Sequence, residues 1–314
     1  MLILGDTPPH ENEEDEIRVN RAKFAARWYP GRPEELRRDL QRYLAEAKEY
    51  PSKLRGAILP HAGLSYSGYG MAEAFANIDP DGYRQAIILA PSHYTALAPD
   101  LLHVENFDLH ETPLGPIPGN PEFWGPAPSR GAARPITPAN GSVEMEHALE
   151  LFFPFLRHTF GEAVRLSLAL VPPLSSMDAV ERLADLLTER IDEGAGREQT
   201  LLIMSSDFTH YGRRFGFTPF GESPREEVEE RVARADLEVA ANAARCEVKW
   251  LQNHFATQET TICGRYPILL GSEVLRRLGA RGEVARYYNS NSFGPADSDY
   301  VCYASVLFSS GEVA

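Results

Sequence analysis

The chain has 314 residues, of which 31 are basic and 45 acidic, so its formal net charge is -14. A chain of this length can bury a large core, and its 43% hydrophobic residues in short runs are typical of a globular protein. The negative charge argues against nucleic acid or an anionic membrane surface as a partner, because both are bound through clustered Lys and Arg.

The first residues and the cysteines indicate a compartment. The segment MLILGDTPPH has no basic region and only a short apolar run, so we expect neither a signal peptide nor a membrane span. Three cysteines, Cys246, Cys263 and Cys302, are too few and odd in number for a disulfide framework. We therefore expect a cytoplasmic protein.

The elements alternate along the chain. Residues 1–17 are polar and acidic and predict a flexible arm, and residues 18–314 predict a single domain. Helical spacing begins at Pro33 and continues to Glu49, with Leu36, Leu40 and Leu44 on one face. Strand-like runs follow at 55–59, 85–90, 164–171, 200–204 and 300–308. Further helical patterns cover 68–77, 146–157, 178–192, 225–244 and 266–278.

This alternation predicts an α/β fold, a three-layer α/β/α sandwich with a mostly parallel central sheet. Residues 112–141 are rich in Pro and Gly and predict a long loop within the domain. Long ordered loops of this kind often lie over a functional site.

Three strand-like runs end in small residues and then present a histidine: His61, His93 and, after Asp207, His210. Loops at the carboxyl ends of parallel strands gather at one edge of the sheet. We therefore expect these side chains to form one pocket of imidazoles and a carboxylate, suited to binding a transition metal or transferring protons. Each histidine alone would more often be a structural residue.

Three further features have a structural and a functional interpretation. Asp207 and His210 are three residues apart, so one turn would let the carboxylate orient the imidazole; the alternative is a helix cap. Cys263 precedes a predicted helix and Arg265, which would favour its thiolate, although a free cysteine is by default a packing residue. His147 and Glu150 would share a helix face, and spacing alone does not tell whether it faces the pocket or solvent.

At this point the motifs resemble those of the Memo family. Six ordered blocks carry the resemblance, and together they span nearly the whole chain after the acidic arm. They are Ala-Arg-Trp-Tyr-Pro-Gly (26–31), Pro-His-Ala-Gly-Leu-Ser-Tyr-Ser-Gly (60–68), Ala-Pro-Ser-His (90–93), Glu-His with Glu150 and Pro-Phe (146–155), Ser-Ser-Asp-Phe-Thr-His-Tyr-Gly (205–212) and Thr-Ile-Cys-Gly-Arg (261–265).

The resemblance implies a fold and a metal site. The family is similar in fold to the class III extradiol dioxygenases, which are non-haem iron enzymes. Its metal position resembles a two-histidine, one-cysteine site, which maps here to His61, His93 and Cys263. Two imidazoles and one further ligand leave positions open, as ferrous oxygen-activating sites require. A thiolate softens the site, so copper or zinc could compete with Fe(II).

The resemblance also implies residues around this site. Asp207 and His210 match residues beside the metal, and Trp28 and Tyr66 match aromatics that line its entrance. Family members usually read His-Ser-x-Glu in the fourth block, whereas Ala148 replaces the serine here. That replacement removes a hydroxyl from the local hydrogen-bond network.

We therefore expect a metal-dependent oxidoreductase, with Fe(II) on His61, His93 and Cys263. His210, oriented by Asp207, would transfer protons, and His147 and Glu150 are further candidate catalytic residues. An alternative is a non-catalytic protein that binds a metal, a small molecule or a peptide in a signalling or multi-protein modification pathway. Bacterial members of the family are often encoded near a radical-SAM protein, which would be a partner in such a pathway. A third hypothesis is a hydrolase with Cys263 as nucleophile and His210 as base.

Overall fold

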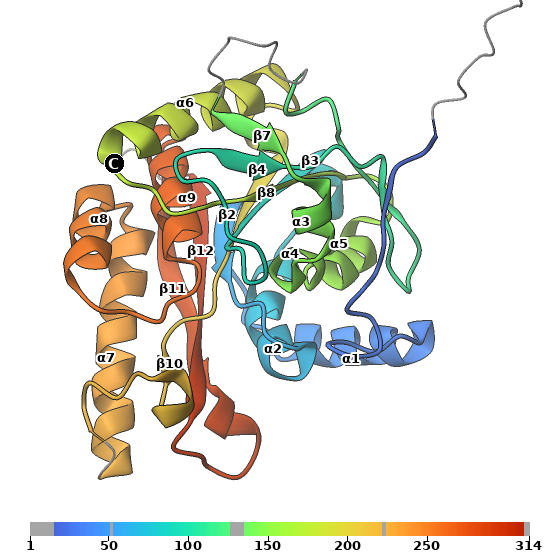
Figure 1. Cartoon of the computed structure of the whole chain (residues 1–314). Coiled ribbons are helices and arrows are strands. Elements are labelled where there is room, and N and C mark those ends of the chain that lie inside the picture. Colours follow the sequence, from blue (N-terminus) through green and yellow to red (C-terminus); the bar gives the residue numbers. More distant parts are fainter. Residues whose placement is uncertain (1–15, 51–52, 126–134, 222–223, 311–314) are drawn as a thin grey trace, which may run out of the picture.

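The computed structural model describes residues 16–50, 53–125, 135–221 and 224–310. Within these residues, nine strands form one mixed sheet in the order β10-β12-β2-β9-β3-β8-β4-β7, with β11 paired to β12 (Figure 1). The strands are β2 (Leu54–Leu59), β3 (Gln85–Ala90), β4 (Leu102–Val104), β7 (Ile136–Pro138), β8 (Arg165–Leu170), β9 (Thr200–Ser205), β10 (His210–Tyr211), β11 (Ala280–Asn289) and β12 (Tyr300–Ser310).

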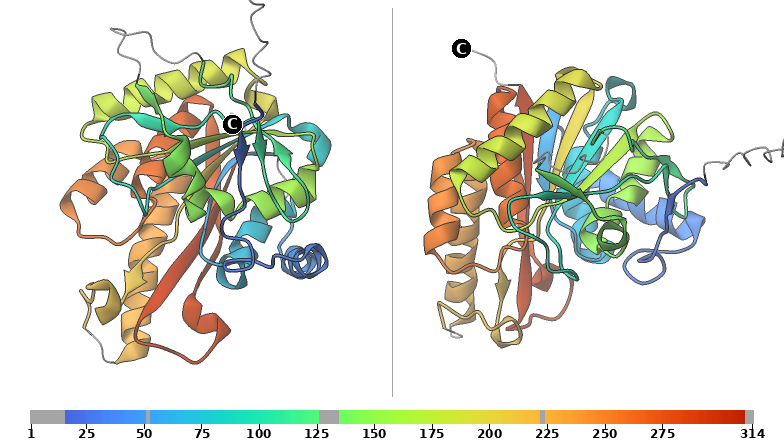
Figure 2. Two further views of the ribbon diagram at one scale, coloured as in Figure 1. Left: turned by 45° about the vertical axis from the view of Figure 1, so that its right-hand side comes forward. Right: turned by 45° about the horizontal axis from the view of Figure 1, so that its top comes forward.

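Helices cover both faces of this sheet, which gives the predicted three layers (Figures 1 and 2). One face carries α6 (Met177–Glu193), α7 (Arg225–Ala244), α8 (Val248–Thr257) and α9 (Arg265–Arg277). The other face carries α1 (Pro33–Ala45), α2 (Leu64–Phe75), α3 (Asn140–Glu144), α4 (His147–Glu150) and α5 (Phe153–Phe160).

The four strands at the centre of the sheet, β2, β9, β3 and β8, are parallel. Strand β12 joins β2 in the antiparallel sense, as does β4 with β8, so the sheet is mixed rather than purely parallel. The carboxyl ends of β2, β3 and β9 consequently meet at one edge. Side chains that follow these strands are brought together there, as expected for a parallel sheet.

The sheet divides the hydrophobic core into two clusters, one on each of its faces. In β3, Ile87 and Leu89 point into the cluster beneath α6 and α9, whereas Ala86 and Ile88 point into the cluster beneath α2 and α5. Because successive side chains of a strand alternate between faces, a strand buried on both sides reads as a continuous apolar run. This explains why the central strands were visible in the sequence.

The predicted elements largely match the observed ones, with two clear differences. The helix predicted over 146–157 is two helices, α4 and α5, because Pro154 lacks an N–H and sits in the first turn of a new helix. Helices α3 and α8 and the strands β4, β7, β10 and β11 of the main sheet were also not predicted. Strand β11 pairs with β12 along its whole length, and the two form a long hairpin.

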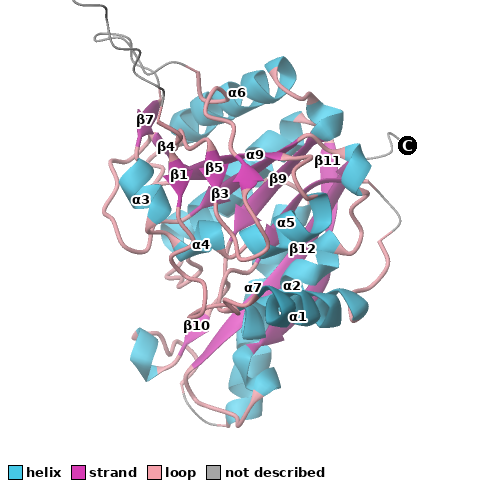
Figure 3. Cartoon of the chain, turned by 90° about the vertical axis from the view of Figure 1, so that its right-hand side faces the viewer, coloured by secondary structure: helices cyan, strands magenta, loops and turns pink. Residues whose placement is uncertain are grey.

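The Pro-rich segment 112–141 carries short strands rather than only loop. A small sheet, β1 (Val19–Asn20), β5 (Leu109–His110) and β6 (Ile117–Pro118), lies beside the main one, and Figure 3 shows β1 next to β5. Most of the predicted acidic arm, and residues 126–134 of the predicted loop, lie outside the described residues. No helix among the described residues has the length and apolar character needed to cross a bilayer.

Candidate metal centre

His61 comes two residues after β2, and its hydrogen bonds define which ring nitrogen carries the proton. Its Nδ1 lies 2.6 Å from the hydroxyl oxygen of Ser205, and that hydroxyl donates to the carbonyl of Ala148, also at 2.6 Å. Since the hydroxyl has only one proton to donate, it accepts from Nδ1. In the neutral ring, Nε2 of His61 is therefore left with a free lone pair.

His93 follows β3 and is held in the same tautomer by a carboxylate. Its Nδ1 lies 2.8 Å from Oε1 of Glu146, and its backbone N–H donates to Oε2 at 2.6 Å. Burial disfavours the charge of Glu146, but hydrogen bonds from His147 and His93 outweigh burial and lower its pKa to about 2. An ionised carboxylate can only accept, so Nδ1 of His93 is the donor and its Nε2 is free.

Cys263 lies two residues before the start of α9 and close to both His61 and His93. Gly264 separates it from the helix, and a Cβ on this glycine would lie 2.4 Å from the carbonyl oxygen of Ser205 and 2.3 Å from Cβ of Ser206. Only glycine therefore lets this segment approach the end of β9 so closely. The approach brings Sγ of Cys263 to 3.2 Å from Nε2 of His61.

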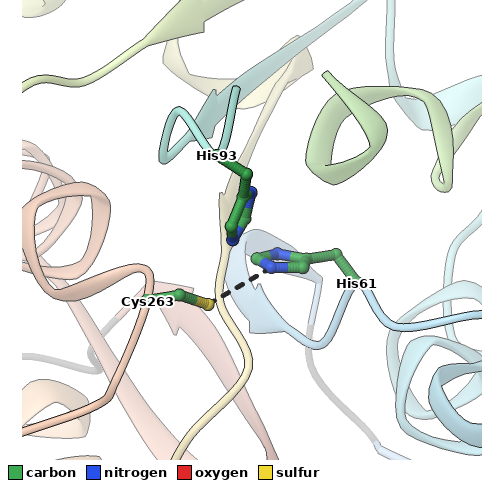
Figure 4. Close-up of side chains that lie close together, drawn as sticks. All are labelled: His61, His93 and Cys263. Atoms are coloured by element: carbon green, nitrogen blue, oxygen red, sulfur yellow. Dashed lines mark hydrogen bonds between the residues drawn. The ribbon is translucent and has the colours of Figure 1, made fainter. Parts of the chain in front are cut away.

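The three side chains point toward one another from three separate loops (Figure 4). One ligand atom from each of His61, His93 and Cys263 can be chosen so that all three lie within 4.8 Å of one another. Metal–nitrogen and metal–sulfur bonds are about 2.0 to 2.3 Å long, so one ion can bridge donors separated by about 4 Å. The spacing and the free Nε2 atoms fit a bound transition metal.

Burial sets the protonation of the donors. It lowers the pKa of His61, and the neighbouring imidazoles His93, His147 and His210 lower it further, so the ring is neutral as a ligand must be. Burial raises the pKa of Cys263, and the charge of Asp207 adds to this. The expectation that its surroundings favour the thiolate is therefore wrong. A coordinated cation would reverse this balance.

Comparison with known proteins gives the family. The family model described as "Memo-like protein" matches residues 20–307. The chain belongs to the Memo family. It is 28% identical to Protein MEMO1 of Xenopus tropicalis, with 79% of this chain and 81% of that protein covered, and 26% identical to Protein MEMO1 of Homo sapiens over the same shares. It is 28% identical to a MEMO1 family protein of Thermococcus onnurineus, over 90% of this chain and 97% of that protein.

One departure from the usual Memo sequence leaves the network intact. Ala148 takes part in the hydrogen-bond network through its main chain. Its N–H donates to Glu146 at 3.1 Å, and its carbonyl accepts from the hydroxyl of Ser205. His61 and His93 thus remain oriented without the missing hydroxyl.

Asp207 and His210 lie beside the donor group, but not as a hydrogen-bonded pair. Residues 206–209 are extended, because Ser206 N–H donates to the carbonyl of Leu59 and Phe208 N–H to that of Cys302. The expected helical turn is therefore absent from this segment. Asp207 instead accepts the backbone N–H of His61 at 2.8 Å.

His210 is oriented by carbonyl groups. Its Nδ1 lies 3.0 Å from the carbonyl oxygen of Phe208 and 3.1 Å from that of Thr261. Since both partners only accept, Nδ1 carries the proton and Nε2 is left as an acceptor. The sequence-based expectation that Asp207 orients this ring is wrong, although His210 is close enough to lower the pKa of Asp207 while burial raises it.

His147 and Glu150 are both buried, and they face different neighbours. The ring centroid of His147 is 4.5 Å from that of His93 and 4.3 Å from the ring of Trp28. Glu150 accepts from the hydroxyl of Tyr29 at 2.7 Å and from the backbone N–H groups of residues 23 and 24. His147 therefore joins the imidazole cluster, whereas Glu150 fixes the segment that carries Trp28.

The two predicted entrance aromatics are not equivalent. Trp28 packs on His147, one ring removed from His93, and borders an open hollow with residues of α1. Tyr66 is 41% exposed, and its ring packs against Phe293. A separate cavity of about 470 Å³ opens directly onto His93 and Cys263, and neither aromatic is among the residues that line it.

Two residues that orient His61 and His93 were not predicted, namely Ser205 and Glu146. Glu146 is 1% exposed and receives hydrogen bonds from both His93 and His147. The sequence feature that could have predicted this role is its position directly before His147, since metal-binding histidines commonly donate a hydrogen bond to a carboxylate. Ser205 ends β9, and nothing in its local sequence distinguishes it from a packing residue.

Proposed function

We propose that this Memo family chain is a metal-dependent oxidoreductase with Fe(II) held by His61, His93 and Cys263. One observation supports the proposal above all: three donors from separate loops converge within 4.8 Å, and both imidazoles are held with Nδ1 as donor and Nε2 free. Three protein ligands leave coordination positions open, as catalytic metal sites require.

A ferrous ion would supply one-electron redox chemistry toward dioxygen. The chain's own part is to orient the ligands and to admit a substrate. Ser205 and Glu146 hold the ring protons of His61 and His93 away from the metal side. The cavity of about 470 Å³ brings a small molecule to the face of the site formed by His93 and Cys263.

His210 is the proposed proton acceptor. Two carbonyl groups hold its Nδ1 as a donor, so Nε2 has a free lone pair. An imidazole held with Nδ1 as its donor presents Nε2 as the atom that can accept a proton from a substrate. The hydrolase hypothesis has less support, because the imidazole next to the Cys263 thiol belongs to His61 and burial raises the pKa of that thiol.

The sulfur ligand supports a second candidate, a protein that holds copper or zinc without turnover. Thiolate ligands favour Cu(I) and Zn(II) over Fe(II) in a given geometry. In that case the imidazoles and Cys263 would bind the metal for storage or for a partner protein, and the neighbouring His210 would have no proton to transfer.

The test compares His61→Ala with His158→Ala, which removes a half-buried histidine of α5 outside the donor group. Metal content is measured after anaerobic purification without added metal, together with electron paramagnetic resonance. Oxygen uptake is then followed with catechol-like substrates on iron-loaded, reduced protein.

We expect about one iron per chain and measurable uptake in the parent and in His158→Ala, and loss of both in His61→Ala. Unchanged metal content in His61→Ala would overturn the metal assignment. Copper or zinc at one per chain, with no oxygen uptake by the iron-loaded protein, would overturn the oxidoreductase and leave the second candidate.

A further inference from the structure

The cavity beside the donor group has its own chemical character. Three loops form it: residues 91–97 after β3, residues 171–173 after β8, and residues 261–266 at the start of α9. Its volume of about 470 Å³ lies in the range of sites for small molecules. His93 and Cys263 form one wall, so a molecule in the cavity lies against the donor group.

The charge of this lining is opposite to that of the protein. Acidic side chains outnumber basic ones by 45 to 31 in the chain, yet the residues that line the cavity include no Asp or Glu. The permanently charged side chain among them is that of Arg265. A positive group in an acid-free, partly enclosed cavity attracts anions there, although the protein as a whole repels them.

Among the residues that the structure describes, one carbonyl accepts a hydrogen bond from the guanidinium of Arg265, so most of its N–H groups are available to a ligand. Nη1 donates to the carbonyl of Thr260 at 3.3 Å, and the guanidinium carbon lies 5.1 Å from the ring centroid of Tyr266. Elsewhere in α9, Arg276 and Arg277 are both paired with the carboxylate of Glu273. Within the described part of the chain, no carboxylate forms a salt bridge with the half-buried Arg265.

The rest of the lining suits an apolar body. Leu97, Val171, Pro172 and Ile262 contribute hydrocarbon surface to the same cavity as the guanidinium and the donor group. The threonines and serine of the lining are neutral. A ligand that fits has one anionic end and one ring-sized or branched apolar part.

We propose that this cavity binds a small carboxylic acid with an apolar body, its carboxylate paired with Arg265. The proposal names the substrate class of the oxidoreductase proposed above and rests on it for the role of the ligand. Guanidinium and carboxylate match in planar, two-point geometry, which gives the strongest side-chain hydrogen bonds. We expect a carboxylate to bind about 10-fold to 100-fold more tightly than a neutral isostere.

The experiment uses the full chain freed of metal by a chelator, so that direct coordination of the ligand to a metal does not contribute. Binding of benzoate and of benzamide, its neutral isostere, is measured by isothermal titration calorimetry. The variants are Arg265→Gln and Arg234→Gln, which removes the same charge from an exposed position on α7. Arg265→Lys is included because it keeps the charge and loses the planar fork.

We expect the parent and Arg234→Gln to prefer benzoate, Arg265→Gln to lose the preference, and Arg265→Lys to be intermediate. Equal binding of the two probes to the parent, no binding of either, or a preference retained by Arg265→Gln would overturn the proposal. If thermal melting shows Arg265→Gln to be unfolded, a full preference in Arg265→Lys would overturn the two-point pairing. Failure of the metal assignment would appear instead in metal content, which these titrations do not measure.

Discussion

Replacing Glu146 by glutamine should weaken metal binding while leaving the fold in place. The carboxylate accepts the backbone N–H of His93 on one oxygen, and the Nδ1 groups of His93 and His147 and the N–H of Ala148 on the other. A glutamine must turn its NH₂ toward one of these sets. If the NH₂ takes the place of the first oxygen, it faces the backbone N–H of His93, and two donors oppose each other. If it takes the place of the second oxygen, it faces Nδ1 of His93, so the ring proton moves to Nε2 and that atom can no longer bind a metal.

The size of the effect follows from these contacts. A hydrogen bond to a charged group contributes about 1.5 to 3 kcal/mol, and partners of ligand histidines typically contribute 10-fold to 100-fold in metal affinity. Because the charge on Glu146 is also lost next to the cation, we expect Glu146→Gln to raise the dissociation constant by about 100-fold. The measurement is an anaerobic competition titration of Fe(II) against a chromogenic chelator.

Glu150→Gln is the matched control. Glu150 is a second buried carboxylate of α4, but it holds the backbone of residues 23 and 24 and the hydroxyl of Tyr29. We expect this variant to lower the melting temperature and to leave the metal dissociation constant within about threefold. Parent-like metal affinity in Glu146→Gln, or equal losses in the two variants, would refute the assignment of Glu146 as the partner that orients His93.

Two further predictions concern stability. Gly264→Ala should lower the free energy of unfolding by several kcal/mol and weaken metal binding, because its Cβ would lie 2.4 Å from the carbonyl oxygen of Ser205. Gly141→Ala is the control, because a Cβ at that position would lie in open space. Equal melting temperatures of the two variants would contradict the steric reasoning. Burial raises the pKa of Glu105 from 4.5 to about 8, so its contribution to stability is fully present below pH 4.5 and is lost as the pH rises through about 8. The free energy of unfolding of Glu105→Gln, relative to that of the parent, should therefore rise by up to about 1.4 kcal/mol per pH unit between these two pH values. Urea unfolding at a series of pH values measures this difference, and parallel pH profiles of variant and parent would contradict the prediction.

The central strands and the proximity of the three candidate donors could be predicted from the sequence, for different reasons. Strands buried on both faces appear as apolar runs such as Ala-Ile-Ile-Leu-Ala after Gln85, and their carboxyl ends meet whatever the length of the connections. The two histidines followed from this geometry, whereas Cys263 came from the family resemblance. Strand β11 was missed because its side chains are mostly half-exposed and carry no run of apolar residues.

The orientation of the site residues could not be predicted from spacing. The three-residue interval between Asp207 and His210 suits a helical turn, but pairing with β2 and β12 keeps the segment extended. Tertiary hydrogen bonds thus override the local pattern. Likewise, spacing placed His147 and Glu150 on one helix face without telling what that face meets, and only the packed structure shows that Glu150 faces the segment with Tyr29.

The distance along the chain between the donors has a consequence for the order in which folding and metal binding would take place at this site. His61 and Cys263 touch although they are 202 residues apart in sequence. Closing a loop of that length in an unfolded chain costs about 5 kcal/mol, so an ion gains little by bridging them before the sheet has formed. In a zinc finger the ligands are close in sequence and the metal drives folding. If this site holds a metal, we therefore expect the chain to fold first, and the ion that binds to depend on which ions the folded site meets.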